Sequence, residues 1–183
     1  MPSATPRELP NPWRAFLVDV DAQLPRPIEM HCLGGLVATF YYDLPRPTND
    51  LDYIEVIPRD AMATLQDIAG IASPLAKKHR VHVQHVAVAS LPESYAERLT
   101  ELLPGTLRRL RLLALDPHDL ALSKLTRNSP IDRADVAQLA NAVPLDADLL
   151  RARYRHELRP IIIGDPERHD RTLEMWIEAY FHS

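Results

Sequence analysis

The pattern of apolar and polar residues divides the chain into a portion that mixes strands with helices and a portion that is helical throughout. Apolar residues recur at helical spacing from Trp13 to Leu24, and the alternation that follows predicts a strand over 28–33. Alternating stretches predict three more strands, over 50–57, 81–88 and 107–115. Between them the sequence predicts helices over 36–42, 60–69, 74–79 and 93–103, the second of these capped by Asp60.

From residue 116 onward the strand pattern is absent. Asp116 followed by Pro117 is a typical helix start, because aspartate caps the free N–H groups and proline fits the first helical position. Helices are expected over 116–127, 132–141, 146–156 and 166–181. The fold class is therefore α/β (α+β), with a loose arm over 1–12, a mixed core over 13–115 and a C-terminal helical tail over 116–183 packed on that core.

Composition narrows the class of protein. A chain of 183 residues buries one core of real size, and 46% hydrophobic with 25% charged residues is typical of a globular protein. The net charge of -4 gives no general reason to expect nucleic-acid binding, although a local basic groove is compatible with it. The lone cysteine forms no internal disulfide, and no signal peptide or membrane span is evident, so we expect a cytoplasmic, bacterial-type protein.

Two Asp-x-Asp segments differ in their expected geometry. Asp19 and Asp21 fall in a helical pattern, where residues two apart point about 200° from each other, so we interpret them as solvated acids. Asp50 and Asp52 fall in a strand, where residues two apart share a face at a separation of about 6.5 Å. Carboxylates held that way can converge on Mg²⁺, which prefers oxygen ligands; the alternative is a pair of acids at a solvent-facing strand start.

The sequence around the second pair favours the metal hypothesis. Gly34 and Gly35 stand between a strand and a helix, where backbone N–H groups and the helix dipole attract phosphate. About fifteen residues later come a basic residue, a threonine and the two acids: Arg46, Thr48, Asp50 and Asp52. Phosphate and metal belong together in nucleotide chemistry, because the metal bridges phosphate oxygens. We also expect Ile54 and Val56 to continue the aspartate face inward.

These residues resemble the nucleotidyltransferase superfamily with the DNA-polymerase-β-like core, and within it the AbiEii-like toxin branch and related uncharacterised bacterial domains. The glycine pair, Arg46, Thr48 and the Asp-x-Asp segment carry the first part of the likeness. A second part is the segment 117–125, PHDLALSKL, followed by DRADV at 132–136. The resemblance covers about residues 14 to 140.

The resemblance implies a mixed β-sheet flanked by helices and transfer of NMP from an NTP to a hydroxyl of RNA, protein or a small molecule. It implies that Asp50 and Asp52 hold Mg²⁺ (or Mn²⁺), that the glycine pair cradles the triphosphate, and that Lys124 acts as a catalytic residue on a phosphate. Three further residues would contact the nucleotide: Arg46, Thr48 and Asp135. The branch also implies a role as the toxin of a toxin–antitoxin pair, with RNA or an antitoxin protein as a partner.

One departure from the family pattern concerns a third carboxylate, which active members usually place on a later strand. The strand expected over 81–88 contains no acid, and His82, Gln84 or His85 would stand there, or Glu93 in another register. This departure motivates an alternative: a catalytically inactive nucleotidyltransferase fold that binds a nucleotide or a partner. A third hypothesis is a structural α/β domain that binds no nucleotide.

Several candidate residues have simpler interpretations. Lys124 could be a surface lysine, Arg46 a loop arginine, and Asp135 a helix cap or a partner of Arg133. Arg108, Arg109 and Arg111 fit either a solvated strand edge or a basic rim for RNA phosphates.

The remaining metal-binding and aromatic side chains are assigned to packing. We expect Cys32 to be a small buried residue, and Trp176, Tyr180 and Phe181 to belong to the core or to a dimer contact. The spacing of the histidines, His79, His82 and His85, does not predict a zinc site.

Overall fold

The computed structural model describes residues 9–44 and 47–181 and divides into two compact units. The first, here called the sheet unit, comprises the chain to residue 41 together with 45–87 and 100–114. The second, the helical unit, comprises 42–44, 88–99 and 115–183. Most of the expected N-terminal arm, 1–12, lies outside the described residues. Helices and a mixed sheet are both present, so the α/β (α+β) class is confirmed.

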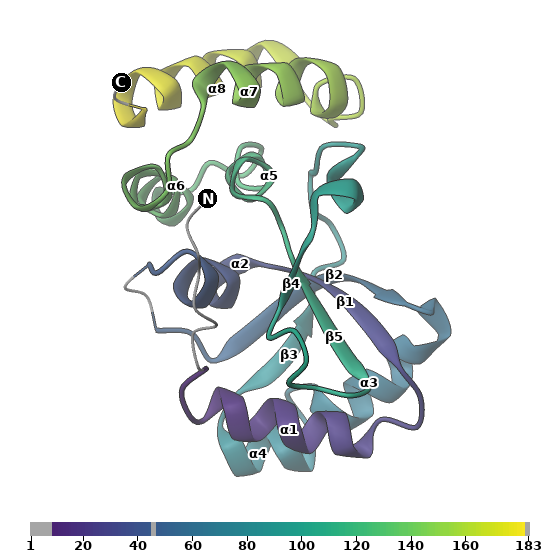
Figure 1. Ribbon diagram of the computed structural model, residues 1–183. Coiled ribbons are helices and arrows are strands. Elements are labelled where there is room, and N and C mark those ends of the chain that lie inside the picture. The colour runs from purple at the N-terminus through teal and green to yellow at the C-terminus, as the bar shows by residue number, and fades with distance from the viewer. Residues whose placement is uncertain (1–8, 45–46, 182–183) are drawn as a thin grey trace. The chain divides into compact units, whose positions relative to one another are not determined.

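A five-stranded mixed sheet forms the centre of the sheet unit, in the order β3-β2-β1-β5-β4 (Figure 1). β1 pairs antiparallel with β2 and parallel with β5, β2 pairs parallel with β3, and β4 pairs antiparallel with β5. The strands are β1 (Ile28–Leu33), β2 (Asp50–Ile57), β3 (His82–His85), β4 (Thr100–Leu102) and β5 (Leu110–Ala114). The bounds of β1 and β2 agree with the sequence prediction.

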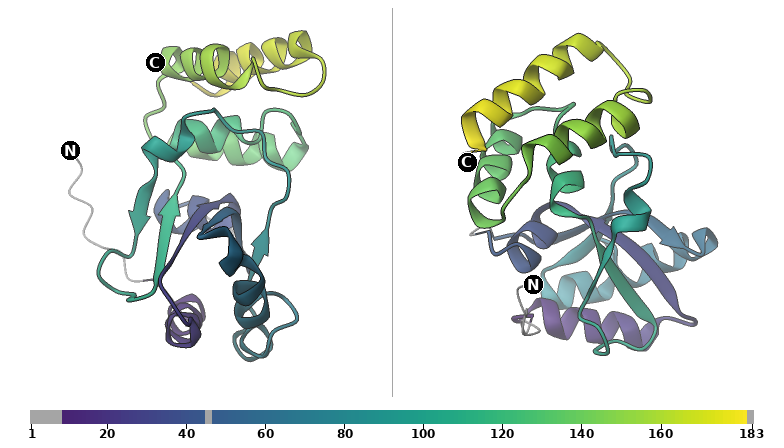
Figure 2. Two further views of the ribbon diagram at one scale, coloured as in Figure 1. Left: turned by 90° about the vertical axis from the view of Figure 1, so that its right-hand side faces the viewer. Right: turned by 45° about the horizontal axis from the view of Figure 1, so that its top comes forward.

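Three helices pack side by side against one face of this sheet: α1 (Trp13–Gln23), α3 (Met62–Ala69) and α4 (Pro74–His79) (Figures 1 and 2). Phe16 and Val20 of α1 and Leu65 of α3 are completely buried. Ser73 caps α4 by accepting a hydrogen bond from the backbone N–H of Ala76. The expectation that Asp60 caps α3 was wrong, because Asp60 lies in the turn η2 (Arg59–Ala61) and pairs with Arg26.

The buried face of β2 changes phase in the middle of the strand. Leu51 and Tyr53 are fully buried toward the helices, where the Gln66 side chain of α3 donates a hydrogen bond to the Tyr53 hydroxyl. The pairing with β1 then shifts by one residue, because Cys32 faces Tyr53 whereas His31 faces Glu55. The unpaired residue is Ile54, so Val56 returns to the buried face. The expectation that Ile54 and Val56 continue the aspartate face was wrong because a β-bulge interrupts the alternation.

A short helical segment follows β1, as the glycine pair predicted. It comprises α2 (Gly34–Leu36) and a π-helical turn, η1 (Val37–Tyr41). Gly34 has a φ of +77°, a conformation that other residues rarely adopt. The glycine therefore turns the chain from strand to helix.

The prediction for residues 93–103 was wrong. Only a turn of 3₁₀ helix forms, η3 (Tyr95–Arg98), and Thr100–Leu102 becomes β4. As a result β5 lies between β1 and β4, so its arginines do not stand on a sheet edge. Arg111 forms ion pairs with Glu29 of β1 and Glu101 of β4, while the Arg109 guanidinium donates to the Leu24 carbonyl.

The helical unit contains α5 (Pro117–Leu122), α6 (Pro130–Ala142), α7 (Ala147–Arg153) continued by the π-helical turn η4 (Tyr154–Leu158), and α8 (Pro166–Tyr180). α5 contacts α6 and α7, and α6 contacts α8. Asp116 caps α5 as predicted, and Ser129 with Asp132 forms a capping box at the start of α6. Trp176 is buried, which confirms it as a core residue.

Candidate functional site

Asp50 and Asp52 lie at the start of β2 on the face that points away from α1, α3 and α4. The face is fixed by their neighbours, since Leu51 and Tyr53 between and after them are fully buried toward the helices. Both aspartates are partly exposed. The two carboxylates therefore share one accessible side of the strand, which is the geometry the Asp-x-Asp spacing predicted.

The glycine pair packs directly against this acidic strand. A Cβ atom built at Gly34 would lie 2.2 Å from Oδ2 of Asp52, far inside van der Waals contact. A Cβ at Gly35 would lie 3.1 Å from Oγ1 of Thr48. Glycine is thus required at residue 34 for two independent reasons, its positive φ and its approach to a carboxylate. The first turn of helix and the acids form one local cluster.

Thr48 links the loop before β2 to the first acid. Its hydroxyl lies 2.5 Å from Oδ1 of Asp50 and 3.2 Å from the Asp50 backbone carbonyl. A hydroxyl that donates to a carboxylate makes a charge-assisted bond and restricts the rotamer of that carboxylate. Arg46, the basic residue of the predicted motif, lies outside the described residues.

The parallel partner strand brings two neutral side chains beside the acids. His82 of β3 pairs with Asp50, and Gln84 pairs with Asp52. His85 faces the other way, since its ring contacts the ring of buried Tyr53 at a centroid distance of 5.3 Å. Over residues 9–44 and 47–181, no three histidine, cysteine, aspartate or glutamate side chains gather as a metal-binding group. The two aspartates therefore have no third acidic neighbour among the described residues.

Lys124 and Asp135 lie together in the helical unit. The Lys124 ammonium is 2.8 Å from Oδ2 of Asp135 and 3.8 Å from Oδ1 of Asp132, and all three residues are buried. The interpretation of Lys124 as a surface lysine was therefore wrong. Its partner is eleven residues away across the turn into α6, a contact that helical periodicity alone does not reveal.

Arg133 does not pair with Asp135, contrary to the simple interpretation of that segment. The Arg133 guanidinium donates to the Asn128 backbone carbonyl. Asp132, rather than Asp135, closes the start of α6, and it also receives two hydrogen bonds from Arg127. These donors hold the pKa of Asp132 well below its usual range although burial acts in the opposite direction.

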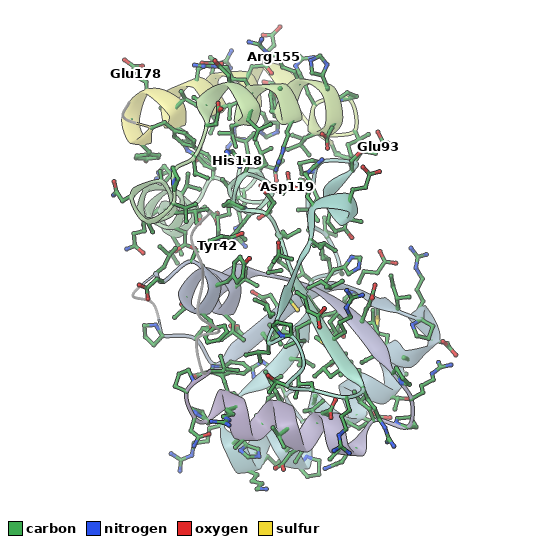
Figure 3. All side chains as sticks on the ribbon, viewed as in Figure 1. Tyr42, Glu93, His118, Asp119, Arg155 and Glu178 are labelled. Carbon is green, nitrogen blue, oxygen red and sulfur yellow. The ribbon has the colours of Figure 1, made fainter. Side chains whose placement is uncertain are left out.

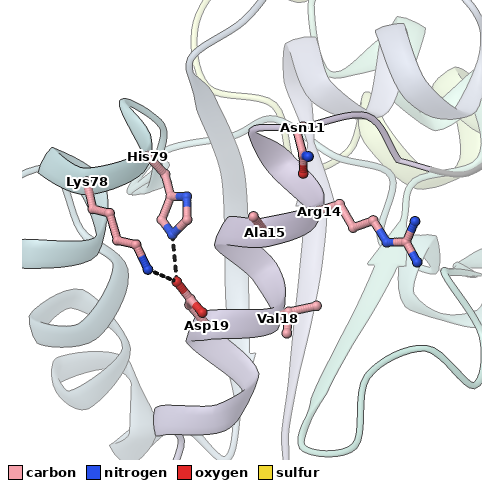
Figure 4. Close-up of a pocket in the computed structure, with 7 residues that line it drawn as sticks. All are labelled: Asn11, Arg14, Ala15, Val18, Asp19, Lys78 and His79. Carbon is pink, nitrogen blue, oxygen red and sulfur yellow. Dashed lines mark hydrogen bonds and ion pairs between the residues drawn. The ribbon is translucent and has the colours of Figure 1, made fainter.

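The first Asp-x-Asp segment is engaged in structural contacts rather than only solvated. Oδ2 of Asp19 is 2.7 Å from Nζ of Lys78 and 2.7 Å from Nε2 of His79, in a shallow pocket between α1 and α4 (Figure 4). Asp21 accepts hydrogen bonds from three consecutive backbone N–H groups, those of residues 108–110. Asp21 thus anchors the start of β5, and neither aspartate shares an ion with the other.

A buried charge network in the helical unit was not foreseen. Asp119, labelled in Figure 3, is completely buried and receives two hydrogen bonds from Arg98 and one from Arg153. Arg98 also pairs with Glu157. Asp119 appeared in the sequence only as part of the Pro-x-Asp-Leu segment, and its structural role follows from two arginines that are distant in sequence.

Cys32 of β1 is fully buried beside the acidic strand, as expected. Burial raises the pKa of its thiol to about 12, so it stays protonated and unreactive. Within the described part of the chain, every helix is too short or too polar to cross a lipid bilayer.

Comparison with known proteins identifies the family. Neither the curated proteins nor the solved structures with which the chain was compared gave a match. One family model does match, over residues 17–182, and its description is nucleotidyltransferase of unknown function (DUF6036). The match spans the glycine pair, the acidic strand and the Lys124 segment together. This chain therefore belongs to that family of nucleotidyltransferases.

Proposed function

We propose that the protein is a metal-dependent nucleotidyltransferase that moves NMP from an NTP to a hydroxyl of RNA, protein or a small molecule. The observation that carries the proposal is the packing of Gly34 against Asp52, in a chain whose family is described as nucleotidyltransferase. Backbone N–H groups at the helix start and carboxylates on the adjacent strand are complementary to a triphosphate and its cation, respectively.

The donor set suits Mg²⁺ or Mn²⁺. Mg²⁺ is commonly bound by one or two carboxylates together with waters and substrate phosphate oxygens, and Asp50 and Asp52 supply that number of carboxylates. When bound, the cation would neutralise charge on the triphosphate and polarise the phosphate that is attacked. The protein's own contribution is to orient the two carboxylates, through Thr48 on Asp50 and through the glycine contact on Asp52.

Lys124 is proposed as a phosphate-binding residue on the strength of the family resemblance. In the structure its charge is compensated by Asp135. Binding of a phosphate would then require Lys124 to share its donors between Asp135 and the nucleotide, which an ammonium with three N–H groups allows. Asp135 acts in this proposal by holding the lysine, and Arg46 by meeting the triphosphate.

The finer biological assignment is the toxin half of a toxin–antitoxin pair, acting in the cytoplasm and countered by an antitoxin protein. It rests on the likeness of the segments 117–125 and 132–136 to the AbiEii-like branch. Its test is induced expression in bacterial cells: growth arrest that Asp50→Asn with Asp52→Asn relieves supports the toxin role, and normal growth of cells with the soluble wild-type protein contradicts it.

One observation favours a second function, a catalytically inactive fold that binds a nucleotide or a partner. The strand beside the acids presents His82 and Gln84 where an additional carboxylate would strengthen the metal site. This alternative predicts metal-dependent nucleotide binding without turnover.

The experiment that separates these functions incubates the pure protein with labelled NTPs and total RNA or candidate proteins. Label transfer that disappears in the Asp50→Asn, Asp52→Asn double variant supports the enzyme. Nucleotide binding with no transfer supports the inactive fold, and absence of both results contradicts the proposal as a whole. Asp19→Asn serves as a control for the loss of an aspartate outside the site.

A further inference from the structure

The register between β2 and β3 assigns a neighbour to each acid of the proposed metal site, on which this inference rests. Residues paired across adjacent strands point to the same face, so His82 stands beside Asp50 and Gln84 beside Asp52. The residue between them, Val83, is buried on the opposite face together with Leu51. Gln84 therefore lies on the accessible side, next to the carboxylate that contacts the glycine loop.

The Gln84 side chain is available for a ligand. It is exposed, and among the described residues no side chain or backbone group forms a hydrogen bond with its amide. Its amide oxygen is a neutral donor of the kind that hard cations accept, and its N–H groups can donate to phosphate oxygens. By contrast, the next residue, His85, packs on Tyr53 and faces the helices.

The charge of the site follows from this arrangement. With Gln84 in place of an acid, two carboxylates alone face the cation, because no third acid, histidine or cysteine joins them in the described residues. Affinity for a divalent cation falls as the number of charged ligands falls. A cation that arrives on a triphosphate brings its own anionic oxygens, so the deficit matters much less for the metal–nucleotide complex.

We propose that Gln84 is the specificity-determining neighbour of the acid pair: it keeps the site at two negative charges, so that the protein binds the preformed metal–NTP complex and holds the free metal only weakly. Gln84 contacts the bound complex through its amide, next to Asp52. His82 plays the lesser part, since its position beside Asp50 does not bring it into a three-residue metal-binding group among the described residues.

The test measures binding of Mn²⁺ alone by electron paramagnetic resonance, without nucleotide, at pH 7.5. Gln84→Asp should raise the affinity for Mn²⁺ by roughly tenfold or more, because it adds a third carboxylate beside the pair. His85→Asp is the matched control, because it adds the same charge one residue away on the opposite face and should leave Mn²⁺ affinity within about twofold. Circular dichroism confirms that each variant is folded.

The outcomes separate this inference from the proposed function. If Gln84→Asp leaves Mn²⁺ affinity unchanged, or if His85→Asp raises it equally, the assignment of Gln84 is wrong while the acid pair can still be the metal site. The second comparison uses the Asp50→Asn, Asp52→Asn variant in a Gln84→Asp background. Loss of the gained Mn²⁺ binding supports both proposals, and its persistence contradicts the acid pair as the metal site.

Discussion

Gly34 and Asp52 approach so closely that a single methyl group at Gly34 would lie 2.2 Å from the Asp52 carboxylate oxygen. The approach joins two segments that are well separated in the sequence: the turn after β1 and the start of β2. It also explains why glycine, the residue that combines a positive φ with no side chain, stands at this turn. The two halves of the predicted nucleotide motif are thus one structural unit.

Gly34→Ala tests this contact, and the chain offers a matched control. Gly105 has nearly the same φ, +74°, but a Cβ atom added there would meet no atom within 4 Å, so Gly105→Ala reports the backbone strain alone. We expect Gly105→Ala to lower the free energy of unfolding by about 1 kcal/mol and Gly34→Ala by about 2–4 kcal/mol, since overpacking adds to the strain. Urea denaturation measures both, and equal losses would contradict the close packing of Gly34 on Asp52.

Thr48→Val tests the orientation of Asp50. Valine preserves the shape of threonine but removes the hydroxyl that donates to Oδ1 of Asp50. We expect weaker binding of the metal–nucleotide complex by roughly tenfold, corresponding to about 1.5 kcal/mol for a charge-assisted hydrogen bond. Thr48→Ser retains the hydroxyl and should restore most of the affinity. Calorimetric titration measures it, and equal affinities for the valine and serine variants would count against an orienting hydroxyl.

The pair Lys124–Asp135 should contribute strongly to the stability of the helical unit. Asp135→Asn leaves the buried ammonium with a neutral partner at the shortest contact, and we expect a loss of about 2–4 kcal/mol in the free energy of unfolding. The matched control is the more exposed pair Arg159–Asp170, where Arg159→Gln should cost about 1 kcal/mol or less. Similar losses for both variants, measured by guanidinium denaturation, would show that the burial of Lys124 has no energetic consequence.

Asp21 should make folding sensitive to acid. Burial raises its pKa, but three backbone donors outweigh burial, so the pKa lies below the ordinary value of 3.8. A carboxyl with a lowered folded-state pKa contributes stability above its unfolded pKa and loses that contribution as the pH falls through the folded value. Asp21→Ala should therefore destabilise the protein by about 1–2 kcal/mol at pH 7, allowing for partial exposure, and by progressively less below pH 3.8.

The measurement is urea denaturation of both proteins from pH 7 down to the acid limit of folding. A difference between wild type and Asp21→Ala that stays constant as the pH falls would contradict the role of the ionised carboxylate. Asp19→Ala is the comparison, because Asp19 bonds side chains rather than backbone N–H groups.

Local patterns were sufficient to predict the elements that build the acid pair. Alternation located both ends of β1 and β2, and the glycine pair located the helical turn between them. They were insufficient wherever a distant segment decides the outcome. Residues 93–103 contain good helix formers, yet Arg98 pairs with Asp119 and Glu157, and 100–102 pairs with β5. Tertiary contacts override weak local propensity there.

The same limit applies within the candidate site. The face of the two aspartates follows from spacing alone, but the bulge at Ile54 depends on the pairing with β1. The residues beside the acids, His82 and Gln84, become known only from the register of β3. Likewise, the partner of Lys124 lies beyond a turn whose geometry the sequence does not specify.

The central claim is that the glycine turn and the acid pair form a metal–nucleotide site. The most direct measurement is calorimetric titration of the full chain with NTP in the presence and absence of Mg²⁺, for the wild type, for Asp50→Asn with Asp52→Asn, and for Asp19→Asn. The account predicts Mg²⁺-dependent NTP binding by the wild type and by Asp19→Asn, and its loss in the double variant. Binding that is independent of Mg²⁺, or that survives removal of both Asp50 and Asp52, would contradict it.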